Sequence, residues 1–218
     1  ITGSAGSIGS EIVRQIIPFF PERLILFDQG ETPLYELEKE LIEKFKNHPI
    51  LNKIEYIVGD IKSYSKVSRT FKKYKPQLIY HAAAYKHVPL MEGNPAAAVL
   101  TNVMGTKILA DLAVEHQVSK FVMVSTDKAV NPTNVMGASK RVAEIYVQSL
   151  NFSEKNKGTQ FITTRFGNVL GSNGSVIPLF RKQIEKGGPI TVTHPEITRF
   201  FMTIPEACQL VLEAGNMG

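Results

Sequence analysis

Gly3-Ser4-Ala5-Gly6-Ser7-Ile8-Gly9 is the stretch that decides the fold, because its regularly spaced glycines lead directly into the helical segment Glu11–Ile17. Glycine lets the backbone turn sharply and approach a pyrophosphate closely, and a helix that follows offers its free amides and its dipole to phosphate oxygens. The pattern predicts a dinucleotide-binding turn, with Gly3, Gly6, Ser7, Ile8 and Gly9 as cofactor contacts. A plain tight turn is the alternative that these glycines alone leave open.

Short runs of β-branched and apolar residues then alternate with longer segments of helical periodicity. The expected strands are Leu24–Asp28, Ile54–Val58, Leu78–Ala82, Lys120–Thr126 and Phe161–Phe166, and the expected helices are Ser7–Ile17, Pro33–Phe45, Ser63–Tyr74, Pro95–His116 and Val135–Leu150. This alternation is typical of βαβ units around a parallel sheet. We therefore predict an α/β fold with a Rossmann-type, doubly wound parallel sheet. Pro33 suits a first helical position, because an amide hydrogen there would have no partner within the helix.

The regular alternation weakens after Phe166. A stretch rich in glycine and asparagine, Gly167–Gly174, precedes an expected helix at Ser175–Lys186, a short strand at Ile190–Thr193 and a helix at Ile204–Gly215. We expect residues 1–166 to form a nucleotide-binding Rossmann domain that also carries the catalytic residues. Residues 167–218 are then a small C-terminal substrate-binding region, interleaved with the end of the fold in a single, truncated catalytic domain.

Composition narrows the classes of protein to consider. The chain has 218 residues, 43% of them hydrophobic, which is enough to bury the core of one domain, and its single cysteine, Cys208, excludes an intrachain disulfide. The net charge of +5 comes from dispersed basic residues, so we expect an anionic small-molecule partner and no nucleic acid. We expect no apolar run to reach the roughly 20 residues that span a bilayer. Because Ile1 already lies inside a motif, membrane attachment is expected only through segments that this chain lacks.

The expected strands end in residues suited to a cofactor, and open α/β sheets bind ligands at the carboxyl ends of their strands. Asp28, about twenty residues beyond the glycines, can accept hydrogen bonds from the adenosine ribose and would repel a 2′-phosphate, so NAD is favoured over NADP. A turn-forming Asp before Gln29-Gly30 is the alternative. Further cofactor contacts are expected at Asp60, Ile61, Ala82, Ala83 and Ala84.

Two more motifs carry chemistry: Ser125-Thr126-Asp127-Lys128 at the end of a strand, and Met136-Gly137-Ala138-Ser139-Lys140 at the start of a helix. With the glycine cradle, His81–Pro89 and Arg165–Pro178, they resemble the extended short-chain dehydrogenase/reductase superfamily over essentially the whole chain. Within this superfamily the chain is most similar to the nucleotide-sugar dehydratases of polysaccharide and protein-glycan biosynthesis.

The resemblance implies that Lys140 holds the nicotinamide ribose of the cofactor. The superfamily normally has a catalytic Tyr four residues before this lysine, where the present chain has Met136. A thioether cannot accept the hydroxyl proton that the phenol takes, so either another group moves the proton or the enzyme is disabled. A triplet that ends in Lys128 resembles UDP-N-acetylglucosamine 4,6-dehydratases, whose large, membrane-associated branch also has Met in place of Tyr.

That dehydration needs an acid and a base side by side. We expect Lys128 to be the base at C5 of the sugar, since burial and the cationic nicotinamide ring favour its neutral form. Asp127 is expected to protonate the departing C6 oxygen, and Thr126 to hydrogen-bond the 4-hydroxyl in a role partly vacated by Met136. The alternative is a turn at the end of a strand with an incidental ion pair.

The resemblance also implies a set of ligand contacts. Lys86 is expected between cofactor and substrate, unless it is a plain surface lysine, and Asn102 is a further cofactor contact. Asn168 is expected at the diphosphate of the substrate, and Arg199 at a phosphate. The walls of a uridine pocket, or alternatively the apolar face of a helix, are expected at Ser175, Val176, Ile177, Pro178, Phe180, Thr191 and Thr193. No metal site is expected, because His87 lacks a partner at ligand spacing, and His81 is expected to be a hydrogen-bonded core residue.

The sequence thus predicts an enzyme, an NAD(P)-dependent UDP-N-acetylglucosamine 4,6-dehydratase. The expected reaction oxidises C4 transiently, eliminates water across C5 and C6, and returns the hydride to C6, giving a UDP-4-keto-6-deoxy-N-acetylhexosamine. A UDP-sugar 4-epimerase, which normally needs the missing Tyr, and a non-catalytic dinucleotide-binding relative are the alternatives. A homo-oligomer is expected, either cytoplasmic or as the cytoplasmic domain of a membrane-anchored bacterial protein.

Overall fold

A parallel β-sheet forms the centre of the molecule. The computed structural model describes residues 1–172, 176–192, 194, 196, 198 and 200–217. Thr2 bridges Phe27 on one side and His81 on the other, so the first residues of the chain lie in the middle of the sheet. On one side stand β1 (Leu24–Asp28) and β2 (Ile54–Val58), and on the other β3 (Leu78–His81), β4 (Lys120–Thr126) and β5 (Gln160–Phe166) follow in that order. The reversal of strand order at Thr2 confirms the predicted doubly wound sheet.

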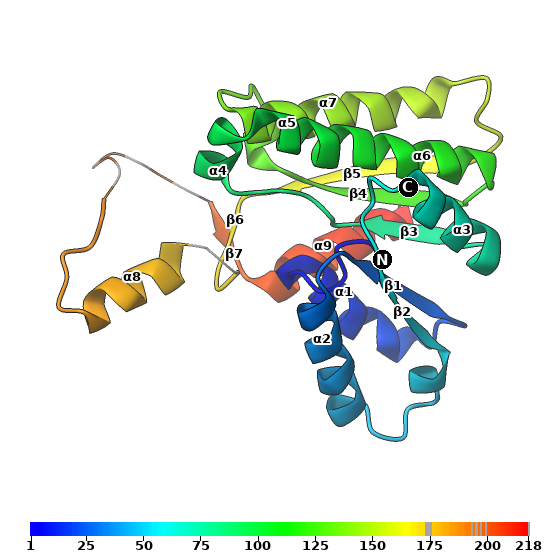
Figure 1. Cartoon of the computed structure of the whole chain (residues 1–218), viewed down its shortest axis with the longest axis horizontal. Helices are drawn as coiled ribbons and strands as arrows, with labels where there is room; N and C mark the ends of the chain where they lie inside the picture. The colour runs from blue at the N-terminus through cyan, green and yellow to red at the C-terminus, as the bar shows by residue number, and fades with distance from the viewer. Residues whose placement is uncertain (173–175, 193, 195, 197, 199, 218) are drawn as a thin grey trace.

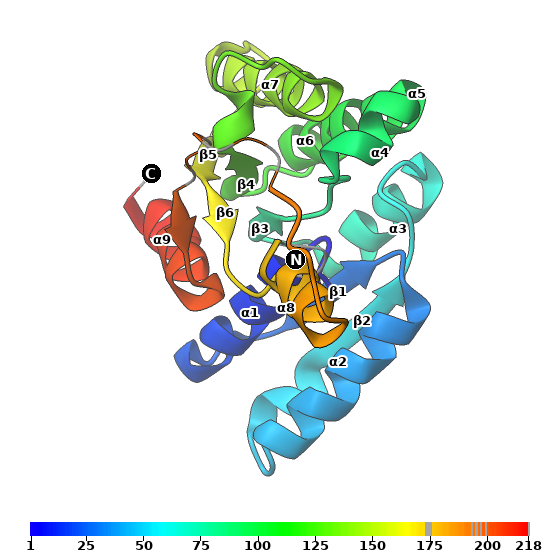
Figure 2. The same cartoon turned by 90° about the vertical axis from the view of Figure 1, so that its left-hand side faces the viewer.

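Helices cover both faces of this sheet (Figure 1). Figure 2 looks along the strands and shows the sheet running diagonally between the two helical layers. The helices are α1 (Ser7–Ile16), α2 (Glu31–Lys44), α3 (Tyr64–Tyr74), α4 (Val88–Gly93), α5 (Pro95–Ala98), α6 (Thr106–Glu115), α7 (Val135–Ser149), α8 (Val176–Glu185) and α9 (Ile204–Met217). The short 3₁₀-helices are η1 (Ile17–Phe19), η2 (Pro49–Lys53), η4 (Asp127–Ala129) and η5 (Leu150–Phe152), and η3 (Val99–Gly105) is a π-helix.

The alternation of side chains along each strand decides which helices pack on each face. In β4, Phe121 and Met123 point to the layer of α3, α6 and α7, where they join the largest cluster of buried residues. Val122 and Val124 point the other way, towards α1 and α9. A third cluster, between α1, α2 and β1, closes the end of the sheet near β2. The apolar runs that predicted buried strands therefore supply the cores on both faces.

Most element predictions are confirmed to within two residues, and the exceptions have local causes. Helix α2 begins at Glu31, so Pro33 is its third residue rather than its first, still within the turn whose amides have no helical partner. The sequence did not predict α4, a short helix that begins after His87 with Pro89 in its first turn.

The helix predicted at Pro95–His116 is interrupted by η3, whose extra residue per turn changes the helical register around Asn102. By length and composition, Pro95–Glu115 matches a membrane-spanning helix, contrary to the expectation that no apolar run does so. Half of its most apolar window is buried, with Leu109 and Leu112 in the main cluster. Its apolar character therefore contributes to the core of this fold.

The segment after Phe166 leaves the sheet and then returns to it. Asn168 and Val169 form β6, which pairs in parallel with β7 (Phe201–Met202), and α9 then packs against α1. The strand predicted at Ile190–Thr193 is wrong for Ile190–Val192, which are not in a strand, and Thr193 lies outside the described residues. The short strand instead forms where Phe201 and Met202 lie opposite β6, because a β-prone run needs an edge with which to pair.

The large-to-small substitution Phe121→Ala should lower the free energy of unfolding by about 3–5 kcal/mol, because it empties a fully buried position between two helices and the sheet. Phe19→Ala is the matched control, since this ring is 79% exposed, and it should change the value by less than about 0.5 kcal/mol. Chemical denaturation followed by circular dichroism measures both values. Equal losses in the two variants would contradict the described core.

Candidate active site

The glycine cradle lies at the carboxyl ends of the central strands, and two of its glycines are required by close backbone contacts. Gly3 has φ +66°, and a Cβ there would lie 2.6 Å from the nitrogen of Ala83. A Cβ on Gly9 would lie 2.0 Å from the carbonyl oxygen of Gly3. Only glycine therefore allows the loop, the first turn of α1 and β3 to come this close together.

The N-terminus of α1 is open towards a ligand. Gly6 caps the helix without a side chain to bond the first amides, and a Cβ on it would contact only the oxygen of Gly3, at 3.3 Å. Amides of a first helical turn need an acceptor, which an anion supplies. The loop thus fits the pyrophosphate of a dinucleotide, which would be held by the backbone of Gly6, Ser7 and Ile8.

Asp28 fixes the cradle as well as its own turn. Its Oδ2 accepts a hydrogen bond from the amide of Ala5 at 2.9 Å, and its Oδ1 accepts one from the amide of Gly30 at 2.9 Å. The turn-forming role that the sequence left open is therefore real. Each carboxylate oxygen keeps a second lone pair, so Asp28 can still accept a hydrogen bond from a ribose hydroxyl.

The other strand-end residues differ in what they offer a cofactor. Asp60 accepts from the amide of Lys62 at 2.9 Å and forms an ion pair with its ammonium, whereas the side chain of Ile61 is buried in the main cluster. Ala82 and Ala84 line a cavity at the carboxyl ends of the strands, which is described next. Ala83 is the residue against which Gly3 packs.

This cavity, of about 520 Å³, brings about half of the predicted site together, and of the triplet only Thr126 lines it. Of the residues expected to bind cofactor or substrate, or to act in catalysis, it is lined by Gly3, Gly6, Ser7, Ile8, Gly9, Ala82, Ala84, Lys86, Thr126, Met136, Lys140, Asn168 and Ile177. The glycine cradle forms one wall, and β6 with the start of α8 forms another. The cavity is thus shared by the cradle and the C-terminal region, as a site for a dinucleotide and a second ligand requires.

The triplet at the end of β4 is a hydrogen-bonded cluster. Thr126 Oγ1 donates to Asp127 Oδ1 at 2.9 Å, and Lys128 Nζ donates to the same oxygen at 3.0 Å. Lys128 Nζ also donates to Asn168 Oδ1 at 3.0 Å, which joins the triplet to β6. Burial works to raise the pKa of Asp127, but the hydrogen bonds from Lys128 and Thr126 outweigh it and hold this pKa below its usual range.

Lys140 is buried on α7 and reaches back to the same strand. Its Nζ donates to the carbonyl oxygen of Val124 at 2.6 Å. Burial lowers the pKa of Lys140 to about 8, and the negative charge of Glu144, one turn further along α7, opposes that shift. Lys140 is therefore still largely an ammonium at neutral pH, and it loses its charge within the mildly alkaline range, beside the cavity.

Glu144 and Arg165 hold this helix against β5, and the sequence analysis did not single them out. Arg165 Nε donates to Glu144 Oε1 at 2.8 Å, and Arg141 adds a second ion pair to the same carboxylate. Burial would raise the pKa of Glu144, but the hydrogen bonds from Arg165 and Arg141 lower it overall. A charged residue four positions after Lys140, on the buried face of a helix, is the signal that could have found this pair.

Met136 and Asn102 shape the wall on the side of α4. Met136 is buried against Met91 and Ala98, and Tyr85, also absent from the predicted site, packs against this group and lines the cavity. Asn102 is fully buried, and its amide accepts from the Tyr85 nitrogen at 2.8 Å and donates to the Tyr85 oxygen at 3.0 Å. Asn102 thus fixes the loop that carries Lys86 and does not itself line the cavity.

The predicted substrate contacts are only partly brought together. Lys86 lines the cavity, where burial lowers its pKa, and Ile177 lines it from α8. Pro178 and Phe180 lie on α8 outside the cavity lining, and Thr191 hydrogen-bonds Gln183 through both its amide and its hydroxyl. Val176 starts α8, while Ser175, Thr193 and Arg199 lie outside the described residues.

The prediction about His81 is confirmed. His81 is a core histidine, held between the hydroxyls of Thr2 at 2.7 Å and Thr106 at 2.8 Å. Burial lowers its pKa to about 3, so it stays neutral in the folded protein. Cys208 is buried on α9, where burial raises the pKa of its thiol to about 12.

A glycine cradle at the switch point of a doubly wound sheet, with a buried lysine on the neighbouring helix, defines a protein of the extended short-chain dehydrogenase/reductase class. A family model described as "Polysaccharide biosynthesis protein" matches residues 1–218, and the chain belongs to this family.

Relatives are similar along the whole chain. CapD of Staphylococcus aureus, a capsular polysaccharide biosynthesis protein, is 55% identical over 219 residues, which cover 100% of this chain and 35% of CapD. An uncharacterised membrane protein, MJ1061 of Methanocaldococcus jannaschii, is 47% identical over 98% of this chain and 61% of its own length. A UDP-glucose 4-epimerase of Rickettsia canadensis is 36% identical over 100% of this chain and 62% of its own length. The chain therefore spans about a third of CapD.

Solved structures share the fold. Pen from Bacillus thuringiensis has a TM-score of 0.91 and 37% identity, over 99% of this chain and 64% of Pen. A double mutant of DesIV, the dTDP-glucose 4,6-dehydratase of Streptomyces venezuelae, has a TM-score of 0.81 and 24% identity, over 97% of this chain and 70% of DesIV, and was solved with NAD bound.

The affinity for NAD should fall as pH rises through about 8. Below this pH Lys140 is an ammonium that can donate to ribose hydroxyls, and above it the buried lysine loses its proton and charge. Calorimetric titration with NAD between pH 6.5 and 9.5, a range of roughly 1.5 units on each side, measures this inflection. Lys140→Met should bind more weakly and without the inflection. A wild-type affinity that stays constant across this range would contradict the assignment.

Proposed function

We propose that this chain is the catalytic part of an NAD-dependent UDP-N-acetylglucosamine 4,6-dehydratase. The observation that carries the proposal is the cluster of Thr126, Asp127 and Lys128, which joins a hydroxyl, a carboxylate and an amine at one point beside the cavity. A plain oxidoreductase or a binding protein has no need for this set of groups. Elimination of water needs a proton taken from carbon and a proton given to oxygen, and this cluster offers a group for each.

Bound NAD supplies the hydride acceptor for C4 of the sugar and the hydride for C6. The proton of the 4-hydroxyl leaves at the same time, and Thr126 can pass it on, because its hydroxyl already donates to Asp127. The low pKa of Asp127 means that it waits as a carboxylate, ready to receive this proton. Asp127 then becomes the acid that protonates the C6 oxygen, which leaves as water.

Lys128 takes the C5 proton in this scheme, in the form of the enzyme in which it is a neutral amine and no longer the cation of the ion pair with Asp127. A neutral amine has two N–H donors, so it can keep its bonds to Asp127 and Asn168 while its lone pair is left for the proton. The amine returns this proton to C5 after the hydride has reached C6. The 4-hydroxyl proton leaves in the water and the C5 proton returns to carbon, so the cycle balances without any other reactant.

Met136 argues against the runner-up, a UDP-sugar 4-epimerase, although several relatives are named UDP-glucose 4-epimerase. Epimerisation at C4 uses a single proton acceptor for the 4-hydroxyl and no base at C5. The thioether of Met136 fills the position of the usual phenol and packs against Met91 and Ala98. A non-catalytic relative would have no use for the buried ammonium of Lys140 next to the ion pair of Asp127 and Lys128.

The remaining proposals concern the setting of the reaction. The positively charged Lys86 in the cavity suits the diphosphate of a nucleotide sugar, and Asn168 remains a candidate contact to it through its Nδ2, because Lys128 uses only its Oδ1. We place the reaction in the cytoplasm, in a domain attached to a membrane through other parts of a longer protein, as the membrane-protein relative suggests. We also propose a homo-oligomer.

Incubation with UDP-N-acetylglucosamine and NAD in deuterated water, followed by NMR, tests the reaction. A 4-keto-6-deoxy product with deuterium at C5 is expected, since the C5 proton passes through Lys128, which exchanges with solvent. Formation of UDP-N-acetylgalactosamine alone would establish the epimerase instead. Binding of NAD with no change in the sugar would support the non-catalytic alternative.

Substitutions in the triplet separate its roles. Lys128→Ala and Asp127→Asn should each lower kcat by about 10²–10⁴-fold, because each removes a general acid or base, while the affinity for NAD stays the same. Lys39→Ala, an exposed lysine on α2, is the control and should keep full activity. Turnover of Lys128→Ala at the wild-type rate would rule out its role as the base.

A further inference from the structure

The edge of the sheet opposite the cavity has a composition that the proposed reaction does not explain. In a sheet of parallel strands, all strands begin at one edge, and the helices that lead into them end there. This edge faces away from α8 (Figure 1). We define the rear edge as the last turns of α1, α2, α3, α6 and α7, the connections that follow them and the first residues of the next strands. It comprises residues 13–24, 41–54, 71–78, 112–120 and 146–160.

Positive charge is concentrated at the rear edge. These residues include eleven Lys and Arg against four Glu, a net charge of +7, whereas the whole chain has +5. The rest of the chain is therefore slightly acidic. Arg14 is paired with Glu11 and Glu40, but most of the other cations are exposed, namely Arg23, Lys44, Lys46, Lys53, Lys72, Lys73, Lys75, Lys155 and Lys157.

The five connections form one continuous surface. Phe20 stacks on His48 at 4.9 Å, which joins the first connection to the second, and the guanidinium of Arg23 lies 6.0 Å from the ring of Tyr74 in the third. The oxygen of Gln77 accepts from the amide of Ser119, and the oxygen of Ser119 accepts from the amide of Gln160, both at 2.9 Å. The positive charges of the five connections therefore lie on one side of the molecule, where they can attract the same anionic partner.

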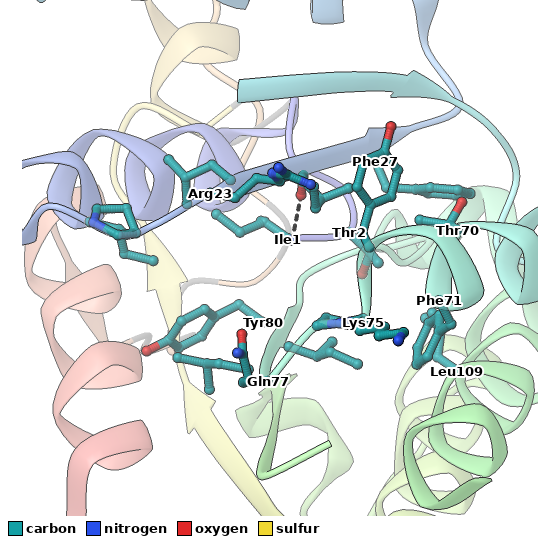
Figure 3. A pocket seen from close by; sticks show the side chains of 18 of the residues that line it. Ile1, Thr2, Arg23, Phe27, Thr70, Phe71, Lys75, Gln77, Tyr80 and Leu109 are labelled. Carbon is teal, nitrogen blue, oxygen red and sulfur yellow. Dashed lines mark hydrogen bonds between the residues drawn. The ribbon is translucent and has the colours of Figure 1, made fainter. Parts of the chain in front are cut away.

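A cavity of about 440 Å³ opens at the same edge, between β1 and β3 (Figure 3). Arg23, Lys75 and Gln77 lie around it in that view, with Ile1 and Thr2 further inside. Arg23 and Lys75, two of the cations of the rear edge, both line this cavity.

Large aromatic side chains project from this basic surface. Phe19 is 79% exposed, Phe20 is 70% exposed and Phe152 is 89% exposed. Phe19 and Phe20 follow α1 in a turn where Phe20 has φ 53°, a conformation that is costly for a residue with a Cβ. Contact with water is unfavourable for phenyl rings. Their exposure among lysines therefore indicates a surface that something other than water covers in the working protein.

We propose that the rear edge binds the surface of an anionic phospholipid bilayer, with Phe19, Phe20 and Phe152 entering the interface between the lysines. Lysines near such a surface are attracted to acidic headgroups, and aromatic rings favour the boundary between headgroups and acyl chains. The lysines and phenyl rings are exposed on several separate connections, an arrangement that suits a broad bilayer surface better than the single backbone of DNA or RNA. The site cavity then faces away from the membrane, open to substrate in solution.

Sedimentation with vesicles tests this proposal directly. The chain should bind vesicles of equimolar phosphatidylcholine and phosphatidylglycerol at low salt, bind less as salt rises, and not bind phosphatidylcholine alone. The triple variant Lys46→Glu, Lys73→Glu, Lys155→Glu should bind the anionic vesicles at least about tenfold more weakly. The matched control, Lys39→Glu, Arg69→Glu, Lys186→Glu, changes the net charge equally at exposed positions away from the rear edge and should bind like the wild type.

The aromatic part of the proposal has its own readout. Phe19→Ser with Phe152→Ser should weaken binding at high salt, where apolar contacts remain, more than at low salt. Equal weakening in the charge variant and its matched control would overturn the proposal, as would equal binding to both kinds of vesicle. Binding to a labelled DNA duplex without binding to vesicles would assign the surface to nucleic acid instead. Thermal unfolding of each variant checks that it is folded, and the dehydratase assay is not needed for any of these outcomes.

Discussion

The pairing of Ile1 and Thr2 between β1 and β3 is the constraint on which the rest of the structure depends. Thr2 donates its amide to Tyr80, accepts from Ala82 and leads into Gly3, whose amide bonds Phe27. These bonds fix the point along the strands at which the chain leaves the sheet. Because the neighbouring strands end at the same level, the glycine cradle, Asp28 and the alanines of β3 meet at one edge, where the cavity opens.

The charges of the site are arranged in two layers around this edge. Close to the cradle, Lys140 is held by a backbone carbonyl, and its charge is maintained by Glu144, which Arg165 in turn neutralises. Further out, Lys128 links Asp127 to Asn168. In the proposed reaction, the inner layer positions the cofactor, whereas the outer layer exchanges protons with the substrate. The proposal thus assigns positioning and proton transfer to different residues.

Much of this arrangement could be predicted from the sequence, because it rests on local signals. Each of these signals predicts the structure of its own segment: the glycine spacing, the β-branched runs and the triplet at the end of a strand. Accordingly, β1, β2 and β4 have the predicted bounds. The parts that could not be predicted depend on distant partners. Nothing near Phe201 shows that it pairs with Asn168, and nothing near Asn102 shows that its amide will bind the backbone of Tyr85. Such contacts become visible only when the chain has folded.

The π-helix at Val99–Gly105 changes the direction in which side chains point along the long helix. A regular α-helix could not direct the same residues to both of their present partners. One residue of an α-helix corresponds to a rotation of about 100°, so one extra residue in a turn offsets everything before it from everything after it. Leu109 and Leu112, beyond the π-helix, pack in the main cluster against the sheet, whereas Asn102, within the π-helix, faces the loop of Tyr85. Deleting a single residue here would restore a regular and intrinsically more favourable helix. It would also turn Asn102 away from its loop, so local helical stability and the shape of the site are in direct conflict at this point.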